Sequence, residues 1–212
     1  MENDTLVKTA IEENDRIMEC CGFVSDRESL PDSLDYEDFD GHGTHVTRLI
    51  LKAAPSAEIF IAKISNGRNI EPQRLDIIAR RGDGVLAIHA SDGLGNDGGI
   101  SPTPMKNREN FSTLGIAIPS KWKKQAVDIS GTSYATPIAA SFAANMLELA
   151  RCKVDLSEHQ QNMLRKYNGV RQILQLMVGK DIQPRGGYDY IVPEINNKLE
   201  ERSRLLIDEM FN

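Results

Sequence analysis

Apolar positions in the stretch that follows residue 42 recur with the spacing of a helix. They lie three or four residues apart, so they share one face when the backbone is helical. The members of this face are Val46, Leu49, Ile50 and Ala53. Because a proline cannot continue a helix, the pattern predicts a helix that begins near His42 and ends before Pro55.

Two later runs, 59–64 and 84–90, are mainly apolar and lack this periodicity. Runs of this length are typical of strands buried on both faces of a parallel sheet. Residues 72–80, between the two runs, have a helical pattern. The alternation of strands and helices predicts an α/β fold, with a mostly parallel sheet flanked by helices in layers.

The polar N-terminal part contains one short apolar patch, 17–24, which predicts a strand. Residues 25–40 carry five aspartates and predict a loop. A second loop is predicted over 91–110, where Gly, Asn, Asp and Pro are frequent.

The C-terminal half is mainly helical in pattern. A short strand, 127–129, leads into Gly131, and a strong apolar face begins near Thr136. Ser157 has the character of an N-cap for a helix that reaches about Tyr167. Helical patterns follow over 170–178 and, in an amphipathic tail, over 194–210.

Composition narrows the classes of function. The 212 residues include 25 basic and 31 acidic side chains, a net charge of -6, which argues against general nucleic-acid binding. There is no run of apolar residues long enough to span a membrane, and the N-terminus has no signal-peptide pattern. Three cysteines, two of them adjacent, make a poor disulfide framework. We therefore expect a cytoplasmic protein.

The first candidate for a catalytic segment is Asp40-Gly41-His42-Gly43-Thr44-His45-Val46. A histidine between two glycines at the mouth of a helix is held by a tight backbone. Its ring can therefore be presented to a neighbour in one orientation, which a general base requires.

The second candidate is Gly131-Thr132-Ser133-Tyr134-Ala135-Thr136-Pro137. A serine directly before a helix lies beside backbone N–H groups that have no intrahelical acceptor. These groups and the helix dipole stabilise an oxyanion that forms when the serine attacks a carbonyl. Pro137 fits early in such a helix, where its missing N–H costs little.

Together, the two motifs resemble the His and Ser signatures of subtilisin-like (S8-type) serine proteases, and especially intracellular fungal-type members. They stand in the family's order, His before Ser. The resemblance implies a three-layer fold, a catalytic general base at His42, a nucleophile at Ser133 and a polypeptide substrate. We expect no cofactor and no metal. The peptidase domain would cover residues 1–180, shortened by internal deletions, and a helical extension would cover 181–212.

Two parts of the family's machinery have no counterpart in this sequence. The family's Asp follows an apolar strand and precedes a glycine. Residues 7–11 look like the start of that strand, but no such Asp follows them. The segment between 64 and 84 is too short for the family's helix, strand and oxyanion Asn loop, and Asn96 resembles that Asn only superficially. An inactive pseudoprotease or binding module, or a truncated gene product, therefore remains an alternative to an active endopeptidase.

Other histidines and charges have simpler interpretations. His42 and His45 could share one helix face and bind a metal, but no third ligand stands at a suitable spacing. His89, in an apolar run, is expected to be packed or paired, and His159 to be solvated. The lysines around Trp122 are expected to form a solvated surface.

Overall fold

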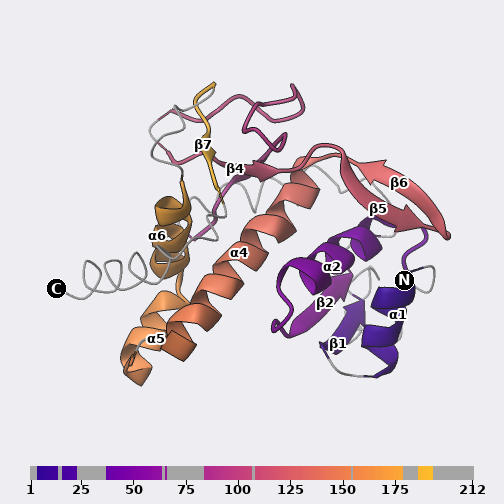
Figure 1. Cartoon of the computed structure of the whole chain (residues 1–212), viewed down its shortest axis with the longest axis horizontal. Coiled ribbons are helices and arrows are strands. Elements are labelled where there is room, and N and C mark those ends of the chain that lie inside the picture. Colours follow the sequence, from indigo (N-terminus) through magenta and orange to yellow (C-terminus); the bar gives the residue numbers. More distant parts are fainter. Residues whose placement is uncertain are drawn as a thin grey trace, which may run out of the picture. The chain divides into compact units, whose positions relative to one another are not determined.

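The computed structural model describes residues 4–13, 16–22, 37–63, 65, 84–106, 108–153, 155–178 and 186–192. In these residues the chain is a mixed α/β protein with five helices and parallel strand pairs (Figure 1). The predicted α/β class is therefore confirmed at this level. The chain divides into two compact units, which are described separately.

The first unit comprises residues 1–85 and 119–128. Its sheet contains two parallel strands, β1 (Ile17–Gly22) and β2 (Ile59–Lys63). The predicted strands at 17–24 and 59–64 are confirmed over these ranges. β2 is not buried on both faces, however: Ile59 packs into the core, whereas Phe60 is 67% exposed.

Helix α1 (Thr5–Glu12) occupies the segment that was expected to begin a strand. That expectation is wrong because Asp4 caps a helix there, accepting hydrogen bonds from the backbone nitrogens of Leu6 and Val7. Val7 and Ala10, three residues apart, then lie on the buried face of one helix.

Helix α2 (His42–Ala53) confirms the helix predicted from apolar spacing. Leu51 packs with Val7 and Ile59, so α2, α1 and β2 share one core. Arg16 joins the loop after α2 to this core, because its guanidinium donates to the carbonyls of Leu51, Ala54 and Ala57.

A hairpin of β5 (Ile118–Trp122) and β6 (Gln125–Ile129) supplies the rest of the first unit. Its two turn residues, Lys123 and Lys124, both have positive φ, at 48° and 67°. These are the dihedral angles of a two-residue hairpin turn whose twist matches that of the strands. Residues 119–128 belong to the first unit, but Ile118 and Ile129 already belong to the second.

The second unit contains a parallel sheet in the order β3 (Ile88–Ser91), β4 (Phe111–Leu114) and β7 (Asp189–Tyr190). The strand expected over 84–90 thus begins later, at Ile88, and residues 84–87 are irregular. The loop predicted over 91–110 is confirmed from residue 92 onwards, except for residue 107, which lies outside the description.

Helix α4 (Thr132–Lys153) packs on one face of this sheet, where Ala139 and Ala143 share a core with Phe111 (Figure 1). Helices α5 (Glu158–Leu164) and α6 (Tyr167–Met177) complete that core. Ser157 is the N-cap of α5 as predicted, and Gln160 closes a capping box with it. The predicted helix ends earlier than expected, and α6 starts anew at Tyr167.

Several predictions fall outside the described residues. These are the helix over 72–80, the amphipathic tail over 194–210 and the domain boundary between 180 and 181. Of the segment 181–212, residues 186–192 are described, and they include β7.

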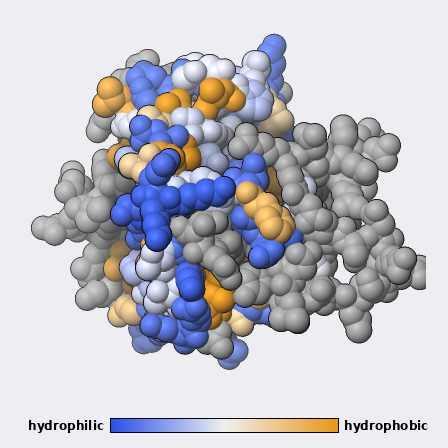
Figure 2. All heavy atoms as spheres, turned by 90° about the vertical axis from the view of Figure 1, so that its right-hand side faces the viewer, coloured by the Kyte–Doolittle hydropathy of each residue, from blue (hydrophilic) through white to orange (hydrophobic). Residues whose placement is uncertain are grey.

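The surface is mixed in character. On the face shown in Figure 2, hydrophobic residues form small areas separated by hydrophilic ones, as far as the coloured atoms show. None of the helices within the described ranges is long and apolar enough to cross a membrane.

Candidate active site

His42 is the first residue of α2, and its side chain is exposed. Gly41 precedes it in the left-handed conformation, with φ of 90°. A Cβ at position 41 would lie 2.9 Å from the ring of Trp122 in the hairpin. Glycine is therefore required there both by the backbone angle and by the indole that covers it.

Asp38 holds the turn that leads into this helix. Its carboxylate accepts hydrogen bonds from the backbone nitrogen of Gly41, at 2.8 Å, and from the nitrogen and hydroxyl of Thr44, at 2.7 and 2.8 Å. Burial opposes the charge, but these hydrogen bonds prevail and lower the pKa of Asp38. This carboxylate therefore caps α2, a role that no sequence motif indicated.

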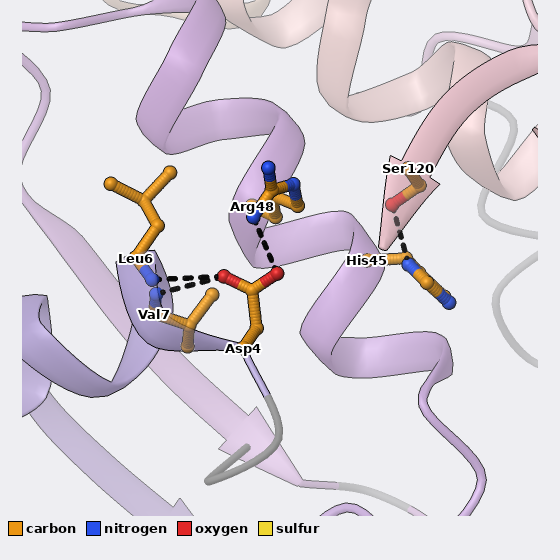
Figure 3. Close-up of polar contacts among 6 residues, drawn as sticks. All are labelled: Asp4, Leu6, Val7, His45, Arg48 and Ser120. Carbon is orange, nitrogen blue, oxygen red and sulfur yellow. Dashed lines mark hydrogen bonds and ion pairs between the residues drawn. The ribbon is translucent and has the colours of Figure 1, made fainter. Parts of the chain in front are cut away.

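His45, one turn after His42, is buried and points to the hairpin. Its Nδ1 forms a 2.8 Å hydrogen bond with the Ser120 hydroxyl of β5 (Figure 3). The ring also lies 5.8 Å from that of Trp122. Burial lowers the pKa of His45, which favours the neutral ring at pH 7. The first turn of α2 is thus fastened to the hairpin.

A second contact fastens the next turn of α2. Arg48 forms an ion pair with Asp4, the carboxylate that also caps α1 (Figure 3). Asp4 is 2% exposed, so this pair is shielded from water. Removing either partner would leave the other buried and uncompensated.

Ser133 is the second residue of α4, and its side chain is exposed. The turn before it is closed by the Gly131 carbonyl, which accepts from the nitrogens of Tyr134, at 3.0 Å, and Ala135, at 3.3 Å. The helix therefore begins at Thr132. The sequence pattern had predicted a later start, near Thr136. Ser133 lies in its first turn, where the backbone N–H groups of the first residues have no intrahelical acceptor.

The serine turn is attached to the carboxyl end of the sheet. The Gly131 nitrogen donates to the carbonyl of Gly115, at 2.8 Å, and Gly115 directly follows β4. The Gly115 nitrogen in turn donates to the last carbonyl of β3, that of Ser91, at 2.9 Å. A Cβ on Gly115 would lie 2.5 Å from the Cβ of Ala90 and 3.1 Å from that of Ala135. The absence of a side chain lets the helix start pack directly on the sheet.

Pro137 is the sixth residue of α4, not the first, because the helix begins at Thr132. It has no N–H to donate to the carbonyl four residues earlier, which belongs to Ser133. We had expected Pro137 to lie in the first turn, where backbone N–H groups have no intrahelical acceptor and a missing N–H costs little. That expectation is wrong. The effect of Pro137 is to leave the Ser133 carbonyl without the usual helical donor.

The two predicted catalytic residues belong to different units, His42 to the first and Ser133 to the second. Each is exposed in the first turn of a helix that follows a glycine with positive φ. Asn96, the superficial match to the oxyanion Asn, donates its side-chain amide to Asp92 within the 92–110 loop. Within the described ranges, no group of three His, Cys, Asp or Glu side chains is placed to hold a metal ion.

No protein-family model matches the sequence, and no characterised protein matches it in a sequence search.

Sequence reasoning missed the residues that support α2. Ser120 and His45 are 75 positions apart, so no local pattern links them. Asp4 could have been found, because an aspartate directly before a helical apolar pattern is an N-cap signal. Asp38 lies three residues before the N-cap position, which Gly41 occupies, so the usual N-cap signal does not identify it.

Proposed function

We propose that the chain carries the site of a subtilisin-like serine endopeptidase, with Ser133 as nucleophile and His42 as general base. The observation that carries this proposal is the attachment of the Ser133 turn to the carboxyl end of the parallel sheet, through Gly131 and Gly115. Open α/β sheets bind their ligands beyond the carboxyl ends of the strands. Ser133 is exposed there, at the positive end of a 22-residue helix.

The chemistry follows from these positions. Ser133 Oγ would attack the carbonyl carbon of a peptide bond, and His42 would accept the hydroxyl proton. Backbone N–H groups in the first turn of α4 would stabilise the oxyanion. His42 would then donate the proton to the leaving amine, and water would release the acyl group from Ser133.

The expected rate is low. In subtilisin, a member of the family that the motifs resemble, loss of the triad Asp lowers kcat by about 3 × 10⁴. Loss of the oxyanion Asn lowers it by about 10²–10³. Asp38, a carboxylate near His42 in sequence, is engaged in capping α2. This engagement favours a second candidate function, a binding module that uses the scaffold without hydrolysis.

Labelling with a fluorophosphonate distinguishes the two functions, because the probe reacts with activated serines. Prolonged incubation followed by peptide mass spectrometry should find the adduct on Ser133, and His42→Ala should slow its formation. Ser157 is an internal control, since it is also an exposed serine at a helix start. A folded protein that carries no adduct on Ser133, or equal adducts on both serines, would support the binding module.

A further inference from the structure

In the part of the chain that the structure describes, the second unit contains a group of buried polar atoms without a hydrogen-bond partner. Within the described ranges, five buried side-chain nitrogen or oxygen atoms lack a hydrogen-bond partner. Four of them belong to three neighbouring residues of the sheet: both ring nitrogens of His89 and the hydroxyls of Ser91 and Ser112. These residues are 5%, 1% and 1% exposed. Buried polar groups are normally hydrogen-bonded, so this concentration needs a physical explanation.

Strand register places the three side chains on one face of the sheet. His89 and Ser91 are two residues apart on β3, so they point to the same side. Ser112 is the partner of His89 on the parallel neighbour β4 and points with it. The opposite face, which includes Ala90 and Phe111, packs against α4. The polar face is therefore distinct from the face that carries the apolar core.

Residues 92–102 and the segment from Tyr188 into β7 lie against this polar face. The Tyr188 ring is 5.0 Å from that of His89, and its hydroxyl donates to the carbonyl of Pro102. Tyr190, the register partner of Ser112, donates to the carbonyl of Gly93. The three polar side chains thus lie between the sheet and a loop that is fixed at two points.

Two other buried serine hydroxyls among the described residues do have partners. The Ser141 hydroxyl, 1% exposed, donates to the carbonyl of Pro137 at 2.7 Å. The Ser120 hydroxyl is hydrogen-bonded to His45 at 2.8 Å. Among the described residues, the buried hydroxyls that lack a partner are those of Ser91 and Ser112, on the β3–β4 face.

The chemistry of these groups indicates what they bind. Burial lowers the pKa of His89, although Asp97 opposes the shift, so the ring is neutral at pH 7 and offers one donor and one acceptor. Each hydroxyl can also donate and accept. These groups suit a small neutral molecule that can both donate and accept hydrogen bonds. They do not suit a metal ion, because no metal-ligating group of three lies within the described ranges.

We propose that His89, Ser91 and Ser112 bind internal water molecules between the sheet of the second unit and residues 92–102. Water satisfies groups of this kind in protein interiors, usually through about three hydrogen bonds for each molecule. The bound water would link the polar face to the loop, which otherwise contacts β3 through Ser101 and the backbone of Ala90. The proposal does not depend on the reactivity of Ser133.

Magnetic relaxation dispersion of the water signal detects long-lived internal water and tests this proposal. The wild-type protein should show a dispersion that falls in the double variant Ser91→Ala, Ser112→Ala. Ser141→Ala is the matched control, because it removes a buried hydroxyl that already has a protein partner, and it should leave the dispersion unchanged. An equal dispersion in the wild type and the double variant would overturn the proposal.

A measurement on the wild-type protein alone keeps the test valid if the double variant does not fold. Nuclear Overhauser spectra should show cross-peaks between the His89 ring and water at a fixed position. Their absence would also overturn the proposal, as would a crystal structure with a metal ion or an organic molecule bound to these three residues.

Discussion

Asp38 illustrates how a single residue near a candidate site can serve the fold instead of the chemistry. Its carboxylate lies four positions before His42, yet it accepts hydrogen bonds from Gly41 and Thr44. It thereby fixes the start of the helix that carries His42. If Asp38 serves as a helix cap, its removal should lower the stability of the protein. A carboxylate that only orients a catalytic histidine would not have this effect.

Replacing Asp38 with alanine should destabilise the protein by about 0.5–2 kcal/mol, the range for losing a helix cap. Urea unfolding followed by circular dichroism measures this change. Glu37→Ala, which removes the same charge from an exposed neighbour, should have little effect. Equal effects of the two substitutions would show that charge alone, and not the cap, is responsible.

His89 and His45 make stability depend on pH. Burial lowers the pKa of both below the ordinary value of 6.5, so the unfolded chain binds protons more readily than the folded one. Their contribution is complete above about pH 6.5 and is lost as the pH falls below it. The urea concentration at the midpoint of unfolding should therefore decrease as the pH is lowered from about 7 to about 5.

The variant His89→Gln should lose part of that pH dependence, whatever its absolute stability. His159 is exposed, so His159→Gln should retain the wild-type slope. A slope that does not differ between His89→Gln and the wild type would contradict the assignment of a lowered pKa to His89.

At the scale of elements, periodicity predicted α2, because its apolar positions define one buried face. The family resemblance misassigned residues 7–11 to a strand, since a short apolar stretch fits either a strand or a helix and the cap at Asp4 decides between them. The start of α4 was placed too late because Gly131, Thr132 and Ser133 have no apolar face. Hydrogen bonds to the Gly131 carbonyl fix that start.

The candidate site residues, which stay a prediction, come from short local motifs. His42 and Ser133 were identified from short segments of sequence, and the structure places both in the first turn of a helix. The contact of His45 with Ser120 joins residues far apart in the chain and depends on how the hairpin packs. Such contacts leave no local pattern in one sequence.

Substitutions in the turn of the β5–β6 hairpin should stabilise the protein. Lys123 and Lys124 have positive φ, which is unfavourable for residues with long side chains, whereas Asn-Gly is preferred in this kind of turn. The double variant Lys123→Asn, Lys124→Gly should gain roughly 1 kcal/mol, because the left-handed conformation costs an ordinary residue about 1–2 kcal/mol and the entropy cost of the new glycine, about 0.5–1 kcal/mol, offsets only part of the relief. Thermal unfolding measures this gain.

A matched control separates backbone conformation from charge. Lys121→Gly also removes a lysine, but from within β5, where glycine weakens a strand. It should lower stability. A gain in both variants would indicate that relief of charge repulsion, rather than of backbone strain, is responsible.

At the scale of the whole molecule, the two motifs belong to separate units. The hairpin residues 119–128 pack with the unit that carries His42, and both hairpin ends continue into the unit that carries Ser133. β6 leads to Gly131 within two residues of its end. The chain therefore connects the two units on both sides of the hairpin, and the proposed chemistry requires that His42 and Ser133 meet.

The distance between His42 Nε2 and Ser133 Oγ in a crystal structure tests this central claim most directly. A general base must come within hydrogen-bonding reach of the nucleophile, about 2.6–3.2 Å and somewhat more in a free enzyme. The proposed peptidase site predicts that the two side chains face each other at about this distance. A separation too large for one water molecule to bridge would contradict it.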